Sequence, residues 1–231
     1  MRFCARNIGA LGVSLLLAAF SGHAHGAGGA FAVDNAGVDD AGTCKVEAWT
    51  SFSHRHDFIG AVAPACALSL GQAVEFGVQF DRLKFDGEWA SGLLLKAKTA
   101  IIPLTDDARF GIALSGGTAL ALPSGDTVAW FFNVPFSFRV ADPLQINVHL
   151  GGLWDRIEDR SLFTWGVGFE LSLSKPVTLI GEVFSVTSRT PGGQIGLRYT
   201  PVEQMDFDIM YGRNLAGEQA DWITLGVNVR F

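Results

Sequence analysis

The sequence predicts an all-β fold, a transmembrane antiparallel up-and-down β-barrel of about 12 strands that follows a cleaved signal peptide. Its last ten residues alternate between an apolar face and a mostly polar face. The chain is rich in glycine and phenylalanine, and only 17% of its residues are charged. No apolar run after residue 20 approaches the roughly 20 residues of a membrane-spanning helix. The apolar residues are therefore dispersed by alternation, as in membrane barrels.

The N-terminus has the pattern of a secretory signal peptide, which we assign to residues 1–26. Arg2 and Arg6 supply its charged region, an apolar run follows, and small residues lead to a cleavage site after Ala24 or Gly26. A lone inner-membrane anchor is the alternative, but the apolar run is short for one. Cleavage removes two arginines and no acid, so the mature chain is more acidic than the net charge of -6. This balance argues against nucleic acid as a partner.

Residues 27–43 are small, acidic and without periodicity. We interpret them as an irregular leader that lies in the periplasm or at the mouth of the barrel, where it is a possible plug. The barrel itself is predicted over residues 44–231.

From residue 44 onward the chain has the pattern of strands separated by turn residues. An even strand number places both ends of a single-chain bacterial barrel on one side of the membrane. Pro64 and Pro135 lie inside predicted strands, where we expect a bulge or a strand end. The predicted strands cover residues 45–53, 58–70, 73–83, 89–102, 109–119, 127–140, 144–156, 162–174, 177–187, 194–200, 206–212 and the closing ten residues.

Alternation within these strands separates a lipid face from a lumen face. In the strand 162–174, for example, Phe163 and Val167 share one face and Thr164 and Glu170 the other. A charge on the lipid face costs about 2–4 kcal/mol at mid-bilayer, so charges should collect on the inward face. The predicted lumen-lining residues are Glu47, Glu75, Asp81, Lys96, Lys98, Arg139, His149, Glu170, Glu182, Arg198, Asp206, Asp208 and Arg230.

Two functions remain open for this inward set, whose charges are of both signs. One is a polar pore with differently charged walls, and the other is a lumen closed by ion pairs. Barrels of eight strands are filled and those of sixteen or more hold channels, so twelve strands do not decide between them.

Cys44 and Cys66 are equidistant from Arg55, the middle of the first predicted connector. A hairpin that turns there places the two cysteines directly opposite each other, at a separation that suits a disulfide. Export to an oxidising compartment permits the bond. We predict the disulfide, and two free thiols are the alternative.

No catalytic residue, metal ligand or cofactor is predicted. The run 54–57, His-Arg-His-Asp, is a weak metal signal because a tetrahedral site lacks further ligands nearby. His149 is the one inward histidine in the predicted strands, and no motif ties it to Ser137 or Ser172. An outer-membrane hydrolase is therefore the least favoured function.

The closing strand places Ile223, Leu225, Val227 and Val229 on one face and ends with Phe231. It resembles the terminal strand of bacterial outer-membrane barrels, which the barrel assembly machinery reads. The resemblance implies that Phe231 is an assembly signal. It also implies the bacterial outer membrane as location, with outer-membrane lipid and the assembly machinery as partners.

A second resemblance lies at the start of the predicted barrel. After an acidic, alanine-containing leader, Gly42, Cys44, Glu47 and Trp49 form a Gly-x-Cys-x-x-Glu-x-Trp motif. The pattern resembles a family of uncharacterised proteobacterial outer-membrane barrels and, more distantly, barrels associated with aromatic-compound degradation. The likeness implies fold and location but not cargo. We therefore predict a narrow channel or transporter for small solutes of unknown identity, with a closed structural barrel as the alternative.

Overall fold

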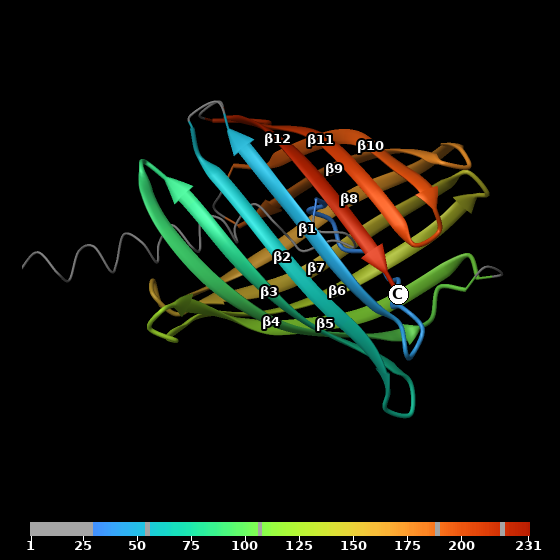
Figure 1. Ribbon diagram of the computed structural model, residues 1–231, viewed down its shortest axis with the longest axis horizontal. Helices are drawn as coiled ribbons and strands as arrows, with labels where there is room; N and C mark the ends of the chain where they lie inside the picture. The colour runs from blue at the N-terminus through green and yellow to red at the C-terminus, as the bar shows by residue number, and fades with distance from the viewer. Residues whose placement is uncertain (1–29, 54–55, 106–107, 188–189, 218–219) are drawn as a thin grey trace, which may run out of the picture.

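The computed structural model describes residues 30–53, 56–105, 108–187, 190–217 and 220–231. They form one closed antiparallel barrel in which each strand pairs with its neighbours in sequence and the first strand closes on the twelfth (Figure 1). The predicted fold class and strand number are confirmed. No helix in these ranges is long and apolar enough to cross a membrane.

The strand bounds agree with the predicted ones to within a few residues. The predicted signal peptide lies outside the described residues. The twelve strands are β1 (Cys44–Ser53), β2 (Phe58–Ser69), β3 (Ala73–Phe85), β4 (Glu88–Ile102), β5 (Phe110–Leu122), β6 (Thr127–Ala141), β7 (Leu144–Asp155), β8 (Arg160–Ser174), β9 (Val177–Val186), β10 (Gly192–Val202), β11 (Met205–Asn214) and β12 (Asp221–Arg230).

We call the end of the barrel where β1 begins and β12 finishes the termini end, and the opposite end the hairpin end (Figure 1). At the hairpin end β3 and β4 are joined by Asp86 and Gly87, whose φ angles of 48° and 86° are both positive. This is the backbone of a type I′ turn, which an Asp-Gly pair adopts readily between twisted strands.

The strand residues that the alternating pattern predicts to face lipid form an apolar outer surface. Phe76, Phe80, Phe163 and Val167 are all 44% to 54% exposed. Tryptophans gather toward the hairpin end, as in the aromatic girdles of membrane barrels; they are Trp89, Trp130 and Trp154.

The expectation of a bulge or strand end at the two prolines is wrong. Pro64 pairs with Val46 of β1, and Pro135 pairs with His149 of β7. On the opposite side of each proline the pairing is interrupted and then resumes in the same register. A strand residue directs its N–H toward one neighbouring strand only, so each proline leaves the pairing with its other neighbour intact.

The predicted disulfide is confirmed. Cys44 and Cys66 are register partners in the β1–β2 hairpin, and their sulfur atoms are bonded. The bond joins the start of β1 to β2 at the point where the chain enters the barrel wall.

Candidate functional site

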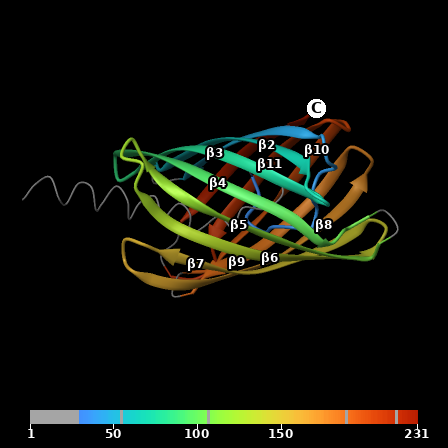
Figure 2. The same cartoon turned by 90° about the horizontal axis from the view of Figure 1, so that it is seen from below.

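Residues 30–36, which we call the inner segment, run inside the barrel. In Figure 2 this stretch, drawn in blue, lies between the strands. Hydrogen bonds join it to side chains of β4, β5, β6, β7 and β9, which surround it. Ala32 and Ala36 are fully buried. The lumen is therefore occupied by the chain's own N-terminal part at this level.

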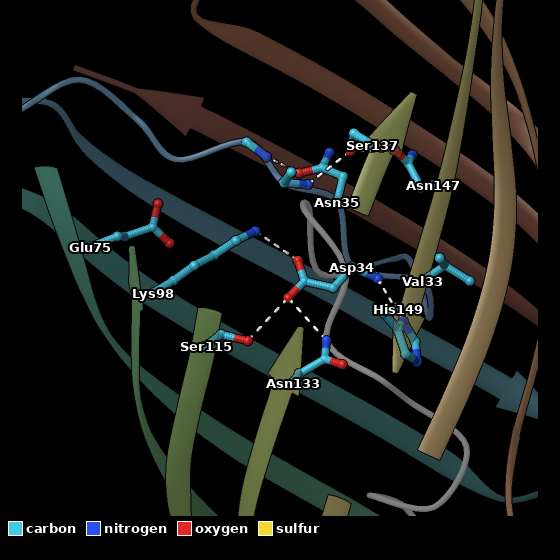
Figure 3. Close-up of polar contacts among 12 residues, drawn as sticks. Val33, Asp34, Asn35, Glu75, Lys98, Ser115, Asn133, Ser137, Asn147 and His149 are labelled. Atoms are coloured by element: carbon cyan, nitrogen blue, oxygen red, sulfur yellow. Dashed lines mark hydrogen bonds and ion pairs between the residues drawn. The ribbon is translucent and has the colours of Figure 1, made fainter. Parts of the chain in front are cut away.

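The carboxylate of Asp34 lies at the centre of these contacts (Figure 3). Its Oδ1 is 2.7 Å from Nζ of Lys98, and its Oδ2 accepts hydrogen bonds of 3.3 Å from Ser115 and Asn133. Lys98, Ser115 and Asn133 are register partners across β4, β5 and β6. Each is about 6% to 7% exposed, so the carboxylate sits among buried donors. We call this arrangement the Asp34 site.

The backbone of the inner segment is held by a second carboxylate. The N–H groups of Ala32 and Val33 donate to the two oxygens of Glu182, at 2.9 and 3.0 Å. Gln194 donates both to Glu182 and to the carbonyl oxygen of Ala30. A segment without secondary structure has unpaired N–H groups, which are costly when buried, and Glu182 satisfies two of them.

Two further N–H groups of the segment bond to β6 and β7. The N–H of Asp34 donates to Nδ1 of His149 at 3.1 Å, and the N–H of Ala36 donates to Oγ of Ser137 at 2.8 Å (Figure 3). Ser137 in turn donates to Asn147. His149 therefore accepts a backbone hydrogen bond and holds the segment.

Glycines in the wall make room for the segment. A Cβ on Gly166 would lie 2.8 Å from Cγ2 of Val33, and a Cβ on Gly226 would lie 3.0 Å from Cβ of Ala30. Both distances are shorter than ordinary van der Waals contact, so larger residues there would displace the segment.

The charges on β10, β11 and β12 form a separate ion-pair network. Arg198 donates two hydrogen bonds to Asp208, of 2.9 and 3.0 Å. Arg230 pairs with Asp206, which also accepts a bond from Thr200. The Arg198 guanidinium lies over the ring of Phe31 in the inner segment, 4.5 Å from the ring centroid. Arg230 thus meets Asp206 of the neighbouring strand, while Asp208 pairs with Arg198.

A third charged group lies at the termini end and involves a residue that the sequence prediction omitted. Lys45 is 2.9 Å from Asp39, 2.8 Å from Glu75 and 3.8 Å from Glu47. Lys45 is two residues from Glu47 in β1 and faces the same side of the strand, so the alternating pattern also predicts it to face the lumen. Asp39 belongs to the leader, and this pair fixes the leader where it leaves the lumen.

The remaining predicted residues have separate partners. Asp81 accepts a bond from Gln79, and Arg139 donates to the carbonyl oxygen of Thr105. Glu170 accepts a short bond from Asn147, at 2.6 Å. Lys96 lies on β4 one inward position from Lys98 and lines the cavity next to the Asp34 site.

This cavity has a volume of about 70 Å³ and extends from the Asp34 site toward the hairpin end. Bulky apolar side chains that line it include Leu94, Phe131, Leu153 and Phe184.

Buried apolar side chains, several of which also line the cavity, form an apolar layer inside the hairpin-end half of the barrel. Leu94, Ala119 and Ala129 are register partners across β4, β5 and β6 and belong to it. Leu94 lies four residues from Lys98 along β4, or about 13 Å at the usual rise of a strand. The full layer comprises Leu83, Leu94, Ala119, Ala121, Val128, Ala129, Leu153, Leu162 and Val186.

The contacts of the described polar residues show no arrangement typical of catalysis. Ser137 is bonded to Asn147 and to the inner segment, and the contact of His149 Nδ1 is with the inner segment. No group of three or more potential metal-binding side chains occurs within the described ranges. Of the predicted weak metal signal, His54 and Arg55 lie outside those ranges.

Fold, lipid-facing belt and polar interior together define an outer-membrane β-barrel. The chain belongs to the family described as "Uncharacterised conserved protein UCP029691", which matches residues 15–231. No curated protein sequence matches the chain.

Solved structures of outer-membrane channels have the same architecture. The KdgM porin, solved in complex with disordered oligogalacturonate, is 12% identical with a TM-score of 0.64; the match covers 81% of this chain and 99% of that one. The COG4313 outer membrane channel from Pseudomonas putida F1 is 11% identical with a TM-score of 0.64, over 86% and 98%. The NanC porin is 9% identical with a TM-score of 0.59, over 80% and 98%. At these identities the likeness establishes the fold.

Proposed function

We propose that the protein is a narrow outer-membrane channel for small solutes, and that residues 27–43 include a plug whose central part is the inner segment. The observation that carries this proposal is the Asp34 site. Wall donors on three strands converge on one carboxylate of a segment that has no secondary structure of its own. Polar contacts of this kind can be exchanged for contacts with water when the segment leaves the lumen, as the channel function requires.

Two barriers lie in series along the proposed path. The inner segment fills the lumen at the level of Lys98, and the apolar layer around Leu94 narrows it toward the hairpin end. Apolar constrictions can close a channel to ions by excluding water, even where the backbone leaves space. The inward charged residues predicted from the sequence would line the path on the termini side of this layer.

Planar-bilayer recording tests the proposal with three forms of the mature protein. The intact chain should conduct rarely. A variant lacking residues 27–37 should conduct in most recordings, and adding Leu94→Ala should raise its single-channel conductance further, because the apolar layer is then wider. The deletion ends before Asp39, so its ion pair with Lys45 is retained.

Leu95→Ala is the matched control, because Leu95 is the next residue along β4 but is 39% exposed on the lipid face. It should leave conductance unchanged in the deletion variant. Heat-modifiable migration in detergent gels verifies that every form is a folded barrel. A folded deletion variant with Leu94→Ala that passes no ions would refute the channel and favour the closed structural barrel.

The other predicted functions receive less support. An outer-membrane hydrolase would need a nucleophile beside a base, whereas Ser137 and His149 are each bonded to the inner segment instead. The resemblance to barrels associated with aromatic-compound degradation stays a prediction. The proposed assembly role of Phe231 rests on its position at the end of β12, where it exchanges two backbone hydrogen bonds with Cys44 of β1.

A further inference from the structure

We infer that the Asp34 carboxylate occupies a binding site for the carboxylate of a transported solute, and that the solute class is small monocarboxylates with an apolar body. This inference rests on the channel function proposed above. The plug would then be held by the same contacts that recognise the solute, so that solute and plug compete.

The site belongs to the wall and not to the plug. Lys98, Ser115 and Asn133 come from consecutive strands, and register pairing sets their backbone positions independently of the segment. The ammonium group of Lys98, the hydroxyl of Ser115 and the amide N–H of Asn133 can all donate hydrogen bonds to a carboxylate. Lys96, one inward position away on β4, places a second positive charge at the same cavity.

Asp34 fills this site incompletely. Its bonds to Ser115 and Asn133 are both 3.3 Å, longer than the usual length of hydrogen bonds to charged groups. A free carboxylate can approach these donors without the restraint of a tethered backbone.

The cavity beside the site indicates the rest of the solute. Its lining includes Leu94, Phe131, Leu153 and Phe184, and it continues away from the carboxylate toward the hairpin end. A charged group at one end and an apolar wall at the other match a short aliphatic or aromatic acid. A charge at the far end of the solute, away from Lys96 and Lys98, would lie against apolar side chains and be disfavoured.

Competition gives the channel a simple means of opening. A solute carboxylate that replaces Asp34 at Lys98 removes the ion pair between the plug and the wall, whereas a neutral solute of the same shape leaves it in place. We therefore expect the plugged barrel to be opened by the class of solute that it carries.

Hexanoate and its neutral isostere hexanamide are the probes. Isothermal titration with the variant lacking residues 27–37, in a non-ionic detergent, should show hexanoate binding about tenfold or more tightly than hexanamide, as expected for losing one charge-assisted hydrogen bond. The Lys98→Gln substitution should weaken the binding of hexanoate by a similar factor. Lys175→Gln should not, because Lys175 is exposed outside the strands. Acetate should bind more weakly than hexanoate, because it leaves the cavity empty.

The intact chain supplies the competition test. Hexanoate should bind it at least about tenfold more weakly than the deletion variant, and Asp34→Asn should recover much of the difference. Equal binding of hexanoate and hexanamide, or an unaffected Lys98→Gln variant, would overturn the inference even if the deletion variant conducts. Binding that depends on Lys98 in a barrel that never conducts would support the site and refute the channel.

Discussion

Neutralising Asp34 is the most direct test of how the lumen is closed. Asp34→Asn keeps the size of the side chain and its backbone contacts but removes the charge that faces Lys98 at 2.7 Å, with Ser115 and Asn133 at 3.3 Å. The side-chain amide of the new asparagine also has N–H groups, and the Lys98 ammonium cannot accept hydrogen bonds from them. We expect the inner segment to leave the lumen far more often.

The magnitude follows from the hydrogen bonds that the substitution weakens. A hydrogen bond to a charged group contributes about 1.5–3 kcal/mol, and the three hydrogen bonds of the Asp34 carboxylate share one charge. A decrease of about 3 kcal/mol in the stability of the plugged state lowers the ratio of closed to open channels by about a hundredfold. The Lys98 ammonium regains hydration in the open lumen, which keeps the decrease below the cost of a permanently buried, unpaired charge.

Single-channel recording measures this ratio directly as open probability. Asp39→Asn is the matched control, because Asp39 is an acid of the same leader whose ion pair with Lys45 lies at the termini end, where Asp39 is 25% exposed. Lys45 keeps its ion pair with Glu75 when Asp39 is neutralised, and Asp39 is the more exposed partner, so the open probability should change much less than in Asp34→Asn. The charge-swapped pair Asp34→Lys with Lys98→Glu should close the channel again. An Asp34→Asn channel with the open probability of the wild type would refute the reasoning.

Three further predictions concern other contacts. Glu182→Ala should raise the open probability as Asp34→Asn does, because two buried N–H groups of the inner segment lose their acceptor; unchanged gating would show that these bonds do not hold the plug. Gly226→Val should open the channel without altering any charge, because the new side chain overlaps Ala30, and the effect should vanish in the variant lacking residues 27–37. Replacing Cys44 and Cys66 by alanine should lower the free energy of unfolding by about 3 kcal/mol in denaturant titrations, as expected for a closed loop of this length; an unchanged midpoint would contradict it.

Alternation explains why so much of the barrel could be predicted. A side chain in a strand faces either lipid or lumen, and a charge facing lipid is costly, so the pattern records both the strand and its orientation. The Cys44–Cys66 pair was predictable for a related reason, because a hairpin pairs residues at equal distances from its turn. Lys45 was accessible to the same argument. The pairing through Pro64 and Pro135 was not, because the sequence does not show toward which neighbour each missing N–H points.

Local sequence patterns are sufficient to predict the strands, their inward and outward faces, the hairpin disulfide and the closing strand before Phe231. All of these depend on residues close together along the chain or on a period of two. The position of residues 30–36 and the pairing of the charges depend instead on contacts between distant parts of the chain. Asp34 is 64 residues from Lys98 in sequence, and Ala32 is 150 residues from Glu182. An irregular segment has no period to indicate its partners, so its position is set by donors that come together only when the barrel closes.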